Sequence, residues 1–171
     1  MPNNSGMTVH AGRAILEESN NFTNEGKAVG EYVKNSWQYT DGPTTVSILV
    51  DQKNKSIQIK DTSRGMDRHT LDNNFFVLNQ QNKDRREGII GRGEYGTGKI
   101  AALGIGETLR VKTVRNKILH IFELRRKDCD ADISQNAAKI RWIKEGENID
   151  EENGTTIELS LIHISEPTRP Y

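Results

Sequence analysis

The chain of 171 residues is long enough for one domain with a buried core, and its single cysteine gives no disulfide framework. Its 24 lysine and arginine residues balance its 24 aspartate and glutamate residues, so the composition does not indicate broad attraction to nucleic acid. The sequence has neither an apolar run long enough to span a membrane nor a secretory leader, so we expect a cytoplasmic protein without a membrane partner.

The first predicted element is an amphipathic helix over residues 25–39. Apolar residues recur along it at four-residue steps, namely Val29, Val33 and Trp37, with Ala28 and Tyr32 alongside. Glu31 and Asn35 are four residues apart and therefore share one face of this helix. A carboxylate beside a carboxamide suits a general base next to a magnesium ligand, and a solvated surface pair is the alternative interpretation.

Two strands are predicted next, over residues 45–50 and 56–60, and the intervening DQKNK is typical of a hairpin turn. The second strand leads into Asp61, which a tight turn with Gly65 and Met66 follows. A carboxylate at this place can enter a pocket and accept a hydrogen bond from the amine of a base. An ordinary loop is the alternative.

Residues 88–99 read GIIGRGEYGTGK, and such a glycine-rich loop lets the backbone approach a phosphate closely. Residues 91–96 match the dinucleotide-binding pattern G-x-G-x-x-G, but the buried strand that should precede it is missing. Residues 93–99 match a P-loop, but Ile100 stands where a hydroxyl should hold magnesium. The third interpretation, a lid that closes over phosphates, depends on the motifs elsewhere in the chain.

The other predicted elements are helices over residues 67–78 and 99–103, a polar loop at 79–87, and strands over 108–114, 117–124, 140–143 and 155–159. Helices gathered on one face of a mixed, mostly antiparallel sheet give an α+β fold, a two-layer sandwich.

Taken in this order, the motifs resemble the GHKL ATPase superfamily of DNA gyrase, the large heat-shock chaperones, sensor histidine kinases and MutL-type repair proteins. The resemblance extends over about residues 28–159 and implies the Bergerat fold, with ATP and Mg²⁺ as ligands. It implies that Glu31 activates water, that Asn35 binds the metal, and that Asp61 contacts the adenine amine. The remaining implied nucleotide-binding residues are Gly65, Met66 and Thr155, with Gly93, Gly96, Thr97, Gly98 and Lys99 in the lid.

We therefore expect Mg-dependent ATP hydrolysis by a module whose lid closes over ATP and drives conformational change in downstream domains or partners. Two departures leave alternatives open. Ser63 stands where the superfamily commonly has glycine, and a non-hydrolysing nucleotide sensor would fit such a change. Residues 36–40 are closer to the histidine kinases, so a kinase-type phosphotransferase is a further alternative, although Glu31 favours hydrolysis.

We expect one ATP-binding domain over residues 1–158, incomplete at its C-terminal end, and a non-native tail over residues 159–171. The stretch LSLIHISEPTR at residues 159–169 resembles the translation of a sequencing adapter, and a genuine strand with a proline-rich end is the alternative. In this interpretation a homodimer would form through regions beyond the given sequence. Contact with nucleic acid is not indicated.

Overall fold

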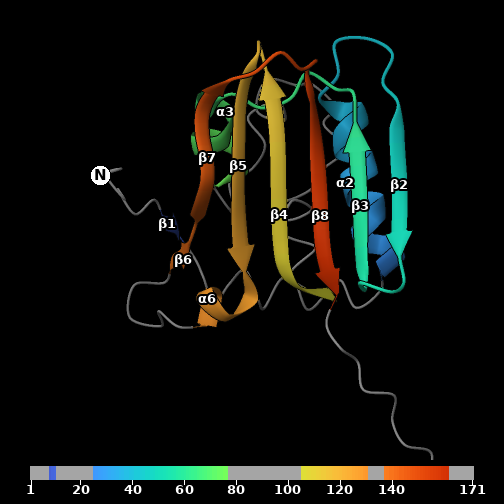
Figure 1. Cartoon of the computed structure of the whole chain (residues 1–171), viewed down its shortest axis with the longest axis vertical. Helices are drawn as coiled ribbons and strands as arrows, with labels where there is room; N and C mark the ends of the chain where they lie inside the picture. Colours follow the sequence, from blue (N-terminus) through green and yellow to red (C-terminus); the bar gives the residue numbers. More distant parts are fainter. Residues whose placement is uncertain (1–7, 11–24, 77–104, 131–136, 162–171) are drawn as a thin grey trace, which may run out of the picture.

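The computed structural model describes residues 8–10, 25–76, 105–130 and 137–161. Its centre is a six-stranded sheet in the order β2-β3-β8-β4-β5-β7, with helices behind one face (Figure 1). The strands are β2 (Val46–Asp51), β3 (Ser56–Asp61), β4 (Gly106–Arg115), β5 (Ile118–Arg125), β7 (Arg141–Asn148) and β8 (Gly154–Leu161). The α+β sandwich expected from the sequence is thereby confirmed.

Each described pairing in the six-stranded sheet is antiparallel. The turn between β4 and β5 has positive φ at Asn116 and Lys117, as a tight hairpin turn requires. The strand β7 is longer than the predicted 140–143. The prediction was too short because the residues of β7 are mostly exposed and show no apolar alternation. A separate pair joins β1 (Thr8–His10) to β6 (Ala137–Lys139).

The predicted helix at 25–39 is α2 (Glu25–Gln38), which packs on β3. Its buried face differs from the predicted stripe: Ala28, Tyr32 and Ser36 are buried, whereas Trp37 is 64% exposed. The polar Ser36 replaces an apolar residue at the end of that face because its hydroxyl contacts a buried carboxylate in the sheet. The prediction from hydrophobicity alone therefore ended the buried face at Trp37, whereas the structure ends it one residue earlier, at Ser36.

The helix predicted over 67–78 begins as α3 (Arg68–Thr70) and continues as a π-helix, η1 (Leu71–Phe75). The Asp67 side chain caps it by accepting the Thr70 N–H at 2.8 Å. At its end, Phe76 donates to the carbonyl of Leu71, five residues earlier, at 2.9 Å. Residues 77 and 78 lie outside the described residues, as does the predicted helix at 99–103. The short α6 (Arg126–Asp130) follows β5.

The core consists of two apolar rows that cross four strands. Strand register aligns Ile59, Ile157, Val111 and Phe122 in one row, and Ile57, Leu159, Leu109 and Leu124 in the next. The rings of Phe75 and Phe76 pack against Phe122 at centroid distances of 5.4 and 5.0 Å. Leu159 is fully buried and β8 continues to Leu161. The division of the chain after residue 158 stays a prediction.

Within the described ranges, the helices are too short or too polar to cross a lipid bilayer.

Replacing Ile59 with alanine is expected to lower the free energy of unfolding by about 2–5 kcal/mol, because it leaves a cavity in the core. Ile48 pairs with Ile59 across the sheet but is 49% exposed, so Ile48→Ala is a matched control that should cost well under about 1 kcal/mol. Urea unfolding followed by circular dichroism measures both changes. Equal losses in the two variants would contradict this placement of the core.

Candidate functional site

Polar residues form a third row at one end of the two apolar rows, on the same face of the sheet. Register places Asp61 of β3 opposite Thr155 of β8, Thr155 opposite Thr113 of β4, and Thr113 opposite His120 of β5. Asp61, Thr113 and His120 are buried, and Thr155 is partly buried. Because the row lies where the helix-covered face meets the loops, it is the candidate site.

The Asp61 carboxylate is held by donors from three parts of the chain. Its Oδ2 accepts the Ser36 hydroxyl from α2 at 2.8 Å. Its Oδ1 accepts the Ser63 N–H at 3.0 Å, the Ser63 hydroxyl at 2.6 Å and the Thr155 N–H at 3.1 Å. A buried carboxylate needs such partners to remain stable away from water. The structure thus fixes the orientation of Asp61.

The loop after Asp61 approaches the neighbouring strands closely through glycine. Gly65 has φ +67°, and a Cβ atom there would lie 1.9 Å from the Val114 carbonyl oxygen. A Cβ atom on Gly154 would lie 2.4 Å from the Asp61 carbonyl oxygen. Both positions require glycine, since any side chain would displace the backbone that carries the site.

The hydroxyl of Thr113 anchors the next residue of this loop. Thr113 Oγ1 accepts the Met66 N–H at 2.8 Å and lies 3.3 Å from the Thr155 hydroxyl. Gly65, Met66 and Thr155 are therefore brought together with Asp61, as the motifs predicted. Neither Thr113 nor Ser36 belongs to the motifs, so neither was predicted as a site residue. The signal for Thr113 is a polar residue on the apolar side of a predicted strand.

Glu31 and Asn35 are one turn apart on α2, and both are partly buried. Glu31 pairs with Lys34 at 2.6 Å, and its side chain is 25% exposed. Among the described residues, nothing forms a hydrogen bond with the Asn35 carboxamide, so this group is available to a ligand. The predicted lid residues Gly93, Gly96, Thr97, Gly98 and Lys99 lie outside the described residues.

A magnesium ion would find few protein ligands at this site. The described residues contain no group of three histidine, cysteine, aspartate or glutamate side chains that could hold a metal. Mg²⁺ usually takes one or two protein oxygens and leaves its other positions to phosphates and water. A partly buried amide oxygen on Asn35, one helical turn from the Glu31 carboxylate, fits that donor set.

His120 extends the polar row beyond Thr113. Its Nδ1 accepts the Gly146 N–H at 3.2 Å, and its ring lies 5.8 Å from that of Trp142. Burial lowers the pKa of His120, the charge of Arg68 lowers it further, and Asp67 and Asp72 oppose the change. His120 is therefore a neutral hydrogen-bond acceptor at neutral pH.

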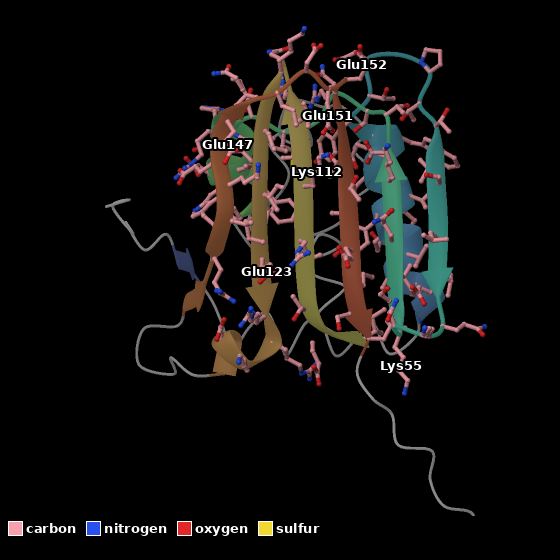
Figure 2. The ribbon with its side chains drawn as sticks, viewed as in Figure 1. Lys55, Lys112, Glu123, Glu147, Glu151 and Glu152 are labelled. Carbon is pink, nitrogen blue, oxygen red and sulfur yellow. The ribbon has the colours of Figure 1, made fainter. Side chains whose placement is uncertain are left out.

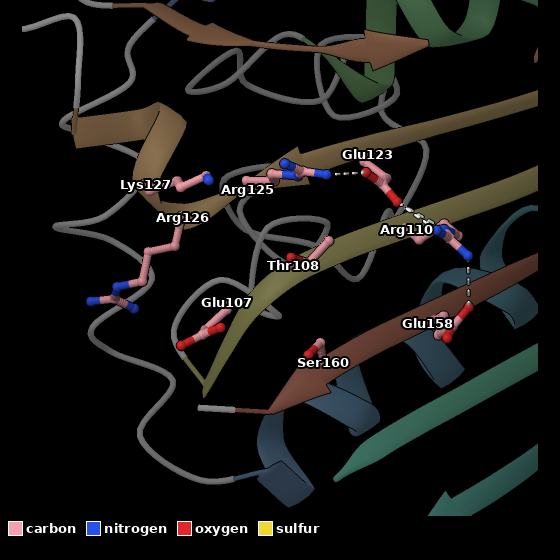
Figure 3. A pocket seen from close by; sticks show the side chains of 9 residues that line it. All are labelled: Glu107, Thr108, Arg110, Glu123, Arg125, Arg126, Lys127, Glu158 and Ser160. Atoms are coloured by element: carbon pink, nitrogen blue, oxygen red, sulfur yellow. Dashed lines mark hydrogen bonds and ion pairs between the residues drawn. The ribbon is translucent and has the colours of Figure 1, made fainter. Parts of the chain in front are cut away.

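The opposite, uncovered face of the sheet carries charged pairs, among them Lys112 and Glu151, which are 2.6 Å apart (Figure 2). At its lower end a cleft of about 590 Å³ opens beside Glu123 (Figure 3). Burial raises the pKa of Glu123, but hydrogen bonds and charges from Arg110 and Arg125 outweigh burial and lower it. The cleft contains none of the predicted site residues.

The sequence model of the histidine kinase-, DNA gyrase B- and HSP90-like ATPase family matches residues 23–156, most of the chain. The chain belongs to this family. The resemblance drawn from the motifs is confirmed, and the sandwich is the Bergerat fold. As a GHKL domain, the chain has ATP binding as its family-level property. Among curated proteins, none matches the chain.

Replacing Thr113 with valine is expected to destabilise this GHKL domain by about 1–3 kcal/mol, because the partly buried Met66 N–H loses its acceptor. Thr113→Ser keeps the hydroxyl and is the matched control, expected to lose much less stability. Urea unfolding measures both variants. A valine variant as stable as the serine variant would contradict the role assigned to this hydrogen bond.

Acidification is expected to destabilise the domain through His120. Because burial holds its folded-state pKa below the ordinary 6.5, the unfolded chain binds a proton first as the pH falls below that value. The free energy of unfolding should therefore decrease below about pH 6.5, and His120→Gln should make this decrease shallower. Denaturant titrations at several pH values measure the slope. An unchanged slope in His120→Gln would contradict this role of His120.

Proposed function

We propose that this GHKL domain binds ATP with Mg²⁺ and hydrolyses it, and that a glycine-rich lid over the phosphates drives conformational change in downstream domains or partners. The observation that carries the proposal is the buried Asp61 carboxylate, which four hydrogen-bond donors orient. Three of these donors reach Oδ1. Among the described donors, Oδ2 receives only the Ser36 hydroxyl, so it can still accept the amine of adenine.

The phosphate end of the nucleotide is assigned to Glu31 and Asn35, which share one face of α2. Asn35 would hold Mg²⁺, which supplies charge neutralisation to the phosphates when bound. Glu31 would accept a proton from water as the water oxygen bonds to the γ-phosphorus and the bond to the β–γ bridging oxygen breaks. The lid would supply backbone amides from Gly93, Gly96, Thr97 and Gly98 to the phosphates, with Lys99 as an additional cation.

Glu31→Gln is expected to retain ATP binding and to lower turnover at least about 100-fold, because glutamine cannot accept the proton. Its matched control is Glu147→Gln, at an exposed glutamate of β7, which should leave turnover unchanged. Phosphate release measures turnover, and calorimetry with ATP and Mg²⁺ measures binding. Unchanged turnover in Glu31→Gln would contradict the general-base role. ATP binding without any turnover in the parent chain would favour the nucleotide sensor.

Asp61→Asn is expected to weaken ATP binding at least about tenfold, because an amide nitrogen would face donors that now point at a carboxylate. Thermal unfolding separates this effect from loss of fold. Ser36→Ala provides a milder test, since it removes one donor and leaves the carboxylate in place. Wild-type affinity in a folded Asp61→Asn variant would contradict the adenine assignment.

A further inference from the structure

The strand β2 forms one edge of the six-stranded sheet and carries an exposed apolar run. Ile48, Leu49 and Val50 are 49%, 63% and 58% exposed, and successive residues point to opposite faces. Within the described part of the chain, β2 pairs with β3 on one side only (Figure 1). This edge therefore presents apolar side chains on both faces of the strand.

The backbone of β2 also presents hydrogen-bonding groups outward. Thr62 donates to the carbonyl of Thr45 at 3.1 Å, which makes that pair a hydrogen-bonded one in the antiparallel ladder. Because such pairs alternate with non-hydrogen-bonded pairs, Ser47 and Leu49 bond to β3. The amides and carbonyls of Val46, Ile48 and Val50 consequently point away from β3.

The opposite edge, β7, has the features that usually prevent strand addition. It carries Lys144, Glu145 and Glu147, and its pairing with β5 contains two register shifts. Charged side chains and irregular pairing protect sheet edges from unwanted partners. The strand β7 is protected in this way, whereas β2 is not. This difference favours β2 as the edge to which another strand is added.

We propose that β2 pairs with β2 of a second copy, antiparallel about a two-fold axis through Leu49. An axis normal to the sheet keeps the helix-bearing faces of both copies on one side. It sets Ile48 opposite the partner's Val50 as a hydrogen-bonded pair, and Leu49 opposite the partner's Leu49 as a non-hydrogen-bonded pair. Apolar residues then meet apolar residues on both faces.

Charge at the two ends of β2 supports a second copy as the occupant. The loop before β2 carries Asp41, which lies 3.8 Å from Arg64 but keeps a side chain 77% exposed, and the turn after β2 carries the exposed Lys53. An antiparallel arrangement brings the Lys53 turn of one copy toward the Asp41 loop of the other. The strand is thus self-complementary in its apolar pairs and in the charges at its ends. The dimer uses no residue of the proposed ATP site.

Sedimentation velocity over a concentration series of the full chain tests the proposal. We expect a monomer–dimer equilibrium, with Leu49→Lys raising the dissociation constant about tenfold or more, because two like charges would face each other. Ile143→Lys is the matched control, since Ile143 is 49% exposed on β7, and it should leave the equilibrium unchanged. A chain that stays monomeric throughout, or a dimer unaffected by Leu49→Lys, would overturn the proposal.

Disulfide trapping tests the register. In a Cys129→Ser background, Leu49→Cys should yield a covalent dimer on mild oxidation, because the Cα atoms of a non-hydrogen-bonded antiparallel pair are about 4.5 Å apart, within the range that a disulfide spans. Ile143→Cys should not. A dimer in solution that gives no Leu49→Cys crosslink, or crosslinks equally through Ile143→Cys, would overturn the β2 pairing. Circular dichroism checks that each variant is folded.

Discussion

Strand register is the constraint on which the core and the candidate site both depend. Across β3, β8, β4 and β5 it aligns two apolar rows and, at one end, the polar row of Asp61, Thr155, Thr113 and His120. Because side chains alternate between the faces, a slip of one residue would turn every one of these side chains outward. Stability of the core therefore selects the register that assembles the site.

Burial of the polar row has a consequence for its geometry. Polar groups away from water are costly unless they are hydrogen-bonded, so each member must find partners within the fold. Asp61 finds them on α2, on its own loop and on β8, and Thr113 supplies one to Met66. The carboxylate is consequently oriented before any nucleotide binds. Ser63 stands where the superfamily commonly has glycine, and its hydroxyl adds one of these hydrogen bonds and strengthens that orientation.

Local patterns predicted the elements better than they predicted the contacts between them. Alternation over two residues correctly located β2, β3, β4 and β5, since each has one buried face or is paired in a hairpin. The buried face of α2 was misplaced because Ser36 is selected by a hydrogen bond to a distant carboxylate, which hydrophobicity does not register. The π-helical η1 was not predicted for a similar reason: Phe75 and Phe76 are both buried against Phe122, a tertiary contact. Thr113 acquires its partner only when β4 lies beside the Asp61 loop.

The helix α2 links the two halves of the proposed nucleotide site. Ser36 holds Asp61 at the adenine end, and Glu31, five residues earlier, is assigned to the phosphate end. A helix rises about 1.5 Å per residue, so these positions are separated by about 7.5 Å along one rigid element. A rotation of α2 that moved Glu31 out of the site would also withdraw the Ser36 hydroxyl from Asp61. In the proposed mechanism, α2 therefore couples recognition of the base to positioning of the group that activates water.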